Sequence, residues 1–142
     1  MSGPIVVSRR IAAPPEQVYR YFTEASRWVQ WQGVDSVIQP EPGGELVMTM
    51  PNGAVARGRF VELVPHKKVV FTWGWDDHPT IPPGSSTVEV EISEVAGESL
   101  VTLTHHDLPK EEIPLHLEGW QRYIPRLAAA AEGRQVPADT GE

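Results

Sequence analysis

Apolar and polar residues alternate in short segments from about residue 34 to residue 107 of this chain. A period of two is the pattern of β-strands, because successive side chains of a strand point to opposite faces of its sheet. The segments are Val34–Gln39, Glu45–Met50, Val55–Val64, Lys68–Trp75, Ser86–Ser93 and Leu100–His105. Most of the connections between them are short and rich in proline and glycine, which is typical of hairpins. The pattern predicts about six strands in a mostly antiparallel sheet.

The residues before this region predict one more strand and two short helices. Ile5–Ile11 is rich in β-branched residues and places its apolar side chains mainly on one face, as a strand does. After a pair of prolines, Val18 and Phe22 recur at helical spacing, and Trp28 and Trp31 share one side of a second short helix. The order is therefore strand, two short helices and then the remaining strands.

A longer helix is predicted to begin near Ile113 or Pro114, because the apolar residues that follow lie on one helical stripe. The stripe consists of Trp120, Tyr123, Ile124, Leu127, Ala128 and Ala131. Gly119 and Pro125 both oppose a regular helix. We expect Gly119 to allow a close approach to the sheet, and Pro125 to bend the helix over the sheet's curved surface.

The 142 residues fall within the usual size of one domain, and no internal repeat or second core is visible. We expect residues 1–133 to form a single domain and residues 134–142 to be a disordered C-terminal tail.

The chain carries a net charge of -7 and no cysteine. Proteins that bind a phosphate backbone usually present a basic patch, so the acidic balance argues against nucleic acid as a partner. No basic segment followed by an apolar run opens the chain, and no apolar run approaches the ~18 residues that span a bilayer. We expect a cytoplasmic protein without membrane insertion, and the sequence indicates neither a metal nor a cofactor.

Several short segments occur in the order that a known family shows. They include Ile11–Tyr19, Gly43–Leu46, Gly58–Pro65, Val70–Trp73, Leu103–His105 and His116–Trp120. On these segments the chain resembles the START-like helix-grip (SRPBCC) superfamily, and most of all the branch named after the activator of heat-shock protein 90 ATPase. The one departure noted is Ser99, which stands where a threonine is expected and affects only a local turn preference.

The resemblance implies an α+β helix-grip fold. In this fold a curved antiparallel sheet of about seven strands wraps around a long C-terminal helix, two short helices follow the first strand, and an apolar cavity lies between sheet and helix. Members share this framework rather than a catalytic signature, so the resemblance implies no particular reaction. The co-chaperone that names the branch has a longer architecture with another domain, which makes chaperone stimulation the least favoured function.

The alternation and the helical stripe together predict which side chains line the cavity. The candidates are Trp28, Trp31, Met48, Met50, Phe71, Trp73, Trp75, Val90, Leu103, His105, His116, Trp120 and Tyr123. Packing alone explains such a group about as well as ligand binding does. Five tryptophans with adaptable methionines nevertheless suit a flat apolar or aromatic ligand.

The sequence leaves the roles of the polar candidates open. Strand parity puts His105 on the apolar face, where a buried histidine with satisfied hydrogen bonds is favoured over a catalytic one. His116 lies four residues before Trp120 and either faces the sheet, caps the helix or is exposed. The residues Asp76–His78 suggest an acid/base or weak metal site, but a solvated loop is favoured.

The leading functional hypothesis is the binding of a small hydrophobic or aromatic molecule without a defined catalytic activity. The first alternative is a cyclase-, aromatase- or hydrolase-like enzyme that uses His105, His116, Tyr123 and Asp76–His78 as acid/base groups. The second is a protein-interaction or co-chaperone-like module. Both a monomer and a homodimer are compatible with the sequence.

Overall fold

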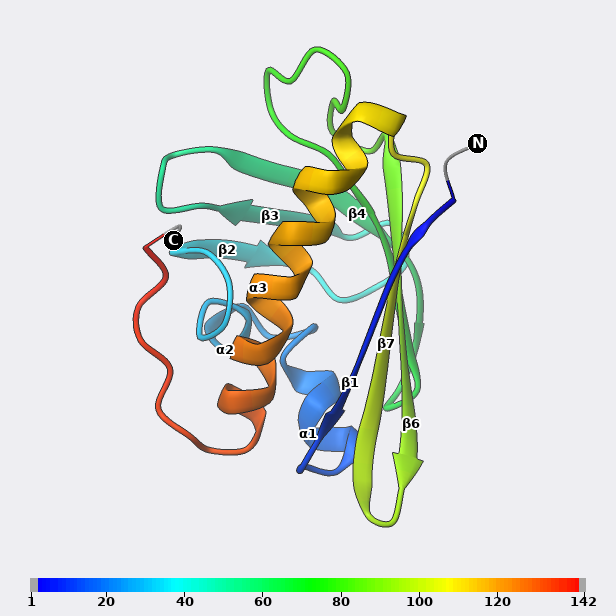
Figure 1. Ribbon diagram of the computed structural model, residues 1–142, viewed down its shortest axis with the longest axis vertical. Helices are drawn as coiled ribbons and strands as arrows, with labels where there is room; N and C mark the ends of the chain where they lie inside the picture. Colours follow the sequence, from blue (N-terminus) through cyan, green and yellow to red (C-terminus); the bar gives the residue numbers. More distant parts are fainter. Residues whose placement is uncertain (1–2, 141–142) are drawn as a thin grey trace.

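The computed structural model describes residues 3–140, which form one seven-stranded antiparallel sheet and helices that cover one of its faces (Figure 1). The strands are β1 (Ile5–Ile11), β2 (Asp35–Ile38), β3 (Glu45–Thr49), β4 (Val55–Val64), β5 (Lys68–Trp73), β6 (Ser86–Val95) and β7 (Glu98–His106). The helices are α1 (Pro15–Arg20), α2 (Ala25–Trp28), the short 3₁₀ helix η1 (Lys110–Glu112) and the long α3 (Ile113–Ala131). The helix-grip architecture predicted from the sequence is confirmed.

The strand order is β1-β7-β6-β5-β4-β3-β2, so β1 pairs with the last strand while β2 forms the opposite edge. The two helices α1 and α2 lie between β1 and β2 in the chain and carry it from one edge of the sheet to the other. All remaining neighbours in the sheet are consecutive hairpin partners. The sheet curves around α3, which crosses its concave face (Figure 1).

The predicted strand boundaries hold within two residues, with an informative difference at Trp75. The strand β5 ends at Trp73, and Trp75 forms only an isolated bridge with Ala56. Between them, Gly74 lies so close to the loop that an added Cβ would be 1.9 Å from the carbonyl oxygen of Pro82. The loop that ends at Ser85 folds back on the end of β5, and because of this close approach only glycine fits at position 74.

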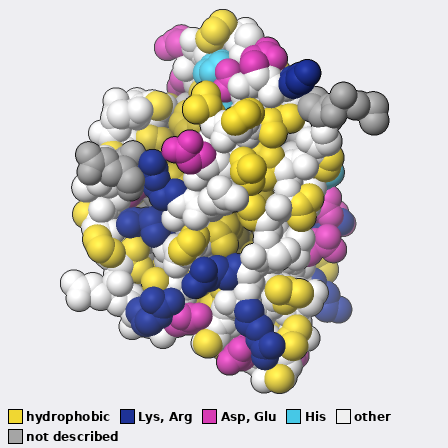
Figure 2. Space-filling model, viewed as in Figure 1, with side chains coloured by type: hydrophobic (Ala, Val, Ile, Leu, Met, Phe, Trp, Pro, Cys, Tyr) yellow, Lys and Arg dark blue, Asp and Glu magenta, His cyan; other side chains and the backbone are white. Residues whose placement is uncertain are grey.

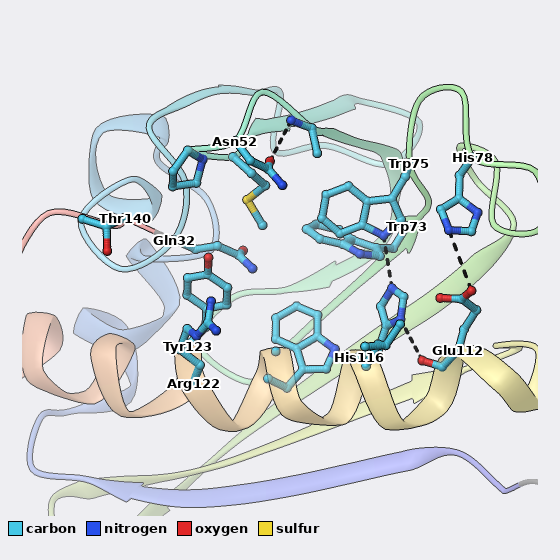
Figure 3. Close-up of a pocket in the computed structure, with 16 residues that line it drawn as sticks. Gln32, Asn52, Trp73, Trp75, His78, Glu112, His116, Arg122, Tyr123 and Thr140 are labelled. Carbon is cyan, nitrogen blue, oxygen red and sulfur yellow. Dashed lines mark hydrogen bonds and ion pairs between the residues drawn. The ribbon is translucent and has the colours of Figure 1, made fainter. Parts of the chain in front are cut away.

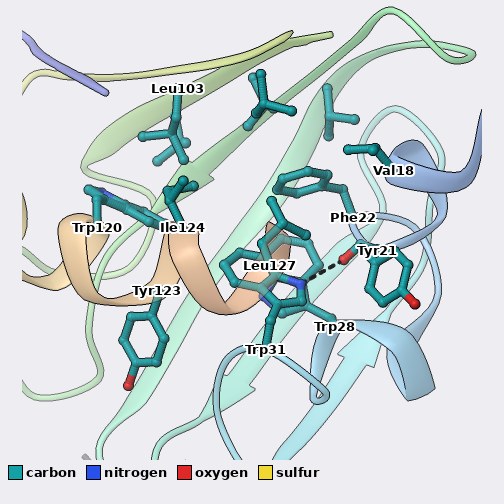
Figure 4. Packing of buried hydrophobic residues seen from close by; sticks show 14 of the residues in the cluster. Val18, Tyr21, Phe22, Trp28, Trp31, Leu103, Trp120, Tyr123, Ile124 and Leu127 are labelled. Atoms are coloured by element: carbon teal, nitrogen blue, oxygen red, sulfur yellow. Dashed lines mark hydrogen bonds between the residues drawn. The ribbon is translucent and has the colours of Figure 1, made fainter. Parts of the chain in front are cut away.

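The interior of the domain is dominated by aromatic rings (Figure 4). Trp28 and Trp31 stack with ring centroids 5.5 Å apart, and Phe22 meets both rings edge-on. The indole N–H of Trp31 donates to the carbonyl oxygen of Tyr21, and that of Trp28 donates to Gln32. Trp28 also meets Phe71 of β5 edge-on, so the fully buried and hydrogen-bonded indoles join the two short helices to the sheet.

The long helix α3 contains both Gly119 and Pro125, the two residues that oppose a regular helix. The expectation that Gly119 permits a close approach to the sheet is wrong, because nothing lies within 4 Å of a Cβ built at this position. Pro125 lies inside the uninterrupted α3 on its exposed side, and the bend expected there stays a prediction.

Residues 134–140 form neither helix nor strand, but they lie against the domain. Arg126 donates to the carbonyl oxygen of Pro137, while the carboxylate of Asp139 accepts from the backbone N–H of Gly33 and from the hydroxyl of Tyr123. Val136 packs on the core. The disorder expected for residues 134–142 stays a prediction, and residues 141–142, like residues 1–2, lie outside the described part of the chain.

Ser99 has a clearer role than a turn preference. It is fully buried in β7, and its hydroxyl donates to the carbonyl oxygen of Ala13 at 2.7 Å, which ties the start of the helical region to the sheet. Replacing Ser99 with alanine is expected to lower the free energy of unfolding by about 1–2 kcal/mol, since a buried carbonyl loses its partner. Urea denaturation measures the change, and the exposed Ser93→Ala serves as the control. Equal effects of the two substitutions would contradict this role.

Candidate functional site

A pocket of about 430 Å³ opens between the sheet and α3 (Figure 3). Its aromatic walls come from both sides: Trp73 and Trp75 from the end of β5 and the bridge that follows, and Trp120 and Tyr123 from α3. Figure 3 shows the side chains of α3 pointing toward the two sheet tryptophans. The other lining residues are Gln32, Met50, Pro51, Asn52, Ala54, His78, Glu112, Leu115, His116, Gly119, Arg122 and Thr140.

The thirteen side chains predicted to line a cavity fall into two groups. Met50, Trp73, Trp75, His116, Trp120 and Tyr123 line the pocket. The remaining side chains are Trp28, Trp31, Met48, Phe71, Val90, Leu103 and His105, and they are buried in the packed interior instead. The strand and helix patterns assigned these seven side chains to the correct faces, but they pack within the closed core, and the open volume lies at the end of the sheet near Trp73 and Trp75.

His105 is a buried histidine whose hydrogen bonds are satisfied. The indole N–H of Trp120 donates to its Nδ1 at 3.0 Å, and its Nε2 lies 2.8 Å from the hydroxyl of Ser86. That hydroxyl donates to the carbonyl oxygen of Trp73 at 2.6 Å, so it accepts from His105. The ring is therefore neutral with its proton on Nε2. Burial lowers the pKa of His105 from 6.5 to about 3, helped by the neighbouring His116 and His106.

His116 lies beside His105, with ring centroids 5.5 Å apart, and its two nitrogens are also engaged. The indole N–H of Trp75 donates to Nε2 at 3.1 Å, and Nδ1 donates to the carbonyl oxygen of Glu112 at 3.0 Å. Burial lowers the pKa of His116 below its usual value. Neither ring can exchange a proton with a ligand without breaking one of these bonds, which weakens both as acid/base groups.

The loop residues Asp76–His78 do not converge on one point. Arg57 holds the carboxylate of Asp76 through two hydrogen bonds of 3.0 Å, which lower the pKa of Asp76. The Nδ1 of His78 instead accepts from the backbone N–H groups of Thr80 and Ile81. Among residues 3–140, no group of three histidine or carboxylate side chains is arranged to hold a metal ion.

Tyr123 closes the opposite end of the pocket from His78 (Figure 3). Its hydroxyl donates to Asp139 at 2.9 Å, and burial together with this carboxylate raises the pKa of Tyr123 to about 12. The phenol is therefore protonated at any physiological pH and holds the C-terminal segment beside the pocket, where Thr140 contributes to the lining.

Several lining residues were not predicted from the sequence, and the most important of them is Glu112. Its position four residues before His116 was a usable signal, because residues at that spacing share one side of a helix. Gln32, Asn52 and Thr140 lie in loops or turns, for which periodicity gives no information about direction.

One face of the molecule gathers apolar side chains beside the N-terminal half of α3 (Figure 2). Leu115 at the pocket rim is 65% exposed. Such exposed apolar residues at the edge of a pocket commonly belong to a binding surface. No helix among the described residues is both long and apolar enough to cross a membrane.

A family model described as "Activator of Hsp90 ATPase homolog 1-like protein" matches residues 12–132, which span both short helices, the sheet beyond β1 and all of α3. The chain belongs to this family. The resemblance inferred from the sequence segments is thus confirmed at the level of both the superfamily and the branch.

The chain is similar to the human activator of 90 kDa heat shock protein ATPase homolog 1, with 25% identity over 119 residues. The match covers 84% of this chain and 34% of the human protein, so the chain spans about a third of the curated relatives it matches. An AHSA1-like protein from Rhizobium etli is 38% identical with a TM-score of 0.72, covering 96% of this chain and 87% of that one.

The fold also matches the Aha1 dimer from Colwellia psychrerythraea with a TM-score of 0.81. The two chains are 18% identical, and the match covers 92% of this chain and 97% of that one. At this identity the likeness concerns the fold alone.

Proposed function

We propose that this protein binds a small apolar or aromatic molecule in the pocket between the sheet and α3. The observation that carries the proposal is the wall of the pocket, where three indoles, a phenol and the thioether of Met50 face one open volume of about 430 Å³. This volume falls within the range of sites for small molecules, and flat aromatic surfaces favour flat ligands.

The hydrogen bonding of the wall supports binding rather than an acid/base reaction. The proton-transfer candidates His105, His116 and Tyr123 all have protein partners, and the pKa values of both histidines are lowered by burial. The wall therefore offers a ligand mostly apolar contact. A cyclase- or hydrolase-like activity stays the alternative, because His105 and His116 are adjacent rather than on opposite sides of the core.

Binding is tested with a panel of uncharged bicyclic aromatics and, for comparison, short fatty acids. We expect the aromatics to quench tryptophan fluorescence in a saturable way and to raise the melting temperature, because Trp73, Trp75 and Trp120 contact the bound ring. Affinities in the micromolar range correspond to about 8 kcal/mol of binding free energy. Saturable binding of no member of the panel would contradict the proposal.

A co-chaperone role is a second candidate, since the curated relatives are named as activators of a heat shock protein ATPase. This chain corresponds to only about a third of each relative. ATP hydrolysis by an Hsp90 with and without this protein separates the two candidates. The cytoplasmic location, and the choice between monomer and homodimer, belong to the same set of proposals.

A further inference from the structure

One pair of polar side chains in the pocket lies apart from His116 and Tyr123, whose hydrogen bonds are satisfied within the protein. His78, from the loop after β5, faces Glu112, the last residue of η1, and both line the pocket (Figure 3). The distance between His78 Nε2 and the nearer carboxylate oxygen of Glu112 is 3.9 Å. That is too long for a direct hydrogen bond, so the two groups oppose each other across a gap.

The proton of His78 can be assigned from its surroundings. Its Nδ1 accepts from two backbone N–H groups, those of Ile81 at 3.0 Å and Thr80 at 3.2 Å, and it therefore carries no proton. The ring proton is on Nε2, which is the nitrogen that faces Glu112. The gap thus has a hydrogen-bond donor on one side and an acceptor on the other.

A hydroxyl group matches this arrangement, because its oxygen accepts one hydrogen bond and donates another. An oxygen about 2.8 Å from both atoms would span the 3.9 Å separation with an angle of about 90° at the oxygen, which hydrogen bonding tolerates. An apolar group in the same place would leave both partners unsatisfied, and a carboxylate would repel Glu112.

We infer that the ligand is an aromatic molecule that carries a hydroxyl group, an inference that rests on the proposed function. The hydroxyl accepts from Nε2 of His78 and donates to the carboxylate of Glu112, while the ring lies against the indoles of Trp75 and Trp120. The pair selects among flat apolar molecules, which the aromatic wall alone does not distinguish.

The side chains are partly protected from water, which makes the selection effective. Glu112 exposes 16% of its side chain and His78 exposes 28%. Hydrogen bonds to a charged partner are stronger than neutral ones, and partial burial reduces the competition from water.

The test compares two probes of nearly the same shape, 2-naphthol and 2-methylnaphthalene, by equilibrium dialysis with the full-length protein. We expect 2-naphthol to bind about tenfold more tightly, which is the effect of one net charge-assisted hydrogen bond. In Glu112→Met, which keeps the length of the side chain without its acceptor, the ratio should fall to within about threefold.

A second variant guards against a misfolded loop. His78→Asn retains an acceptor for the backbone N–H groups of the loop but has no donor at the position of Nε2, so it should also reduce the ratio. The control is the exposed Glu111→Gln, which should keep the full ratio. A ratio near one in the wild-type protein, or an undiminished ratio in both variants, would overturn this inference alone. Failure of both probes to bind would overturn it together with the proposed function.

Discussion

Gly119→Phe is expected to abolish ligand binding while leaving the protein at least as stable as the wild type. Gly119 lines the pocket, and nothing lies within 4 Å of a Cβ at this position, so the phenyl ring has room to enter the ligand's space. The same substitution removes a glycine from the interior of α3, which should stabilise the helix by about 0.5 kcal/mol. Affinity for the aromatic probes should drop about 100-fold or more, as measured by fluorescence titration.

The matched control is Gly119→Ala. It gains about 1 kcal/mol of helix propensity, somewhat more than Gly119→Phe does, but adds only a methyl group to a pocket of about 430 Å³, and it should weaken binding far less. Thermal denaturation of all three proteins separates the two effects. Full-strength binding by Gly119→Phe would place the ligand elsewhere and exclude this pocket as the site.

The largest expected effect on stability is a steep loss of unfolding free energy between pH 7 and pH 5, caused by His105. Its pKa is about 3 in the folded protein, whereas an unfolded histidine has a value near 6.5. Below pH 6.5 the unfolded chain binds a proton that the folded chain does not. The contribution of neutral His105 to the free energy of unfolding is therefore fully present above this pH. It falls by about 1.4 kcal/mol per pH unit as the solution becomes more acidic.

Between pH 6.5 and pH 5, His105 alone should lower the free energy of unfolding by about 2 kcal/mol. His116, whose pKa is lowered by burial as well, acts in the same direction. Urea denaturation at a series of pH values measures the slope. His105→Gln should lose stability at neutral pH but show less than half of the wild-type slope above pH 5, where carboxylates contribute little. A variant with an unchanged slope would mean that His105 becomes protonated without unfolding.

The hydrogen-bond network around His105 gives this histidine a role in the structure of the core. The bonds from Trp120 to His105, and from His105 through Ser86 to the carbonyl of Trp73, connect α3 to β5, β6 and β7. The network therefore fixes the indole of Trp120, which lines the pocket, and holds the backbone at Trp73. A catalytic use of His105 would require it to give up the bond that holds Trp120 in place.

Local sequence patterns were sufficient for the elements and their faces. The alternation Val88, Val90, Ile92 correctly predicted the buried face of β6, and parity correctly placed His105 inward and His106 outward. These predictions succeed because a strand has a fixed period of two, whatever the rest of the chain does. Likewise, the helical stripe that includes Trp120 and Tyr123 identified the buried side of α3.

Patterns of this kind could not locate the open volume of the pocket, because a packed side chain and a pocket-lining side chain obey the same periodicity. Trp31 and Trp75 are both aromatic residues at positions predicted to line the cavity, yet only Trp75 lines the pocket. The difference lies in how Trp28 and Trp31 stack and fill one end of the concave sheet, which is a matter of volume and not of spacing.

The sequence by itself determined the strands, the helices and the side of each element that faces the core, because these follow from the local geometry of the chain. Only the tertiary structure decided that Gly119 faces open space, that Asp76 pairs with Arg57 while His78 faces Glu112, and that the hydrogen bonds of His105 and His116 are satisfied within the protein. Such contacts join residues far apart in the chain, and their direction depends on packing that no local period encodes.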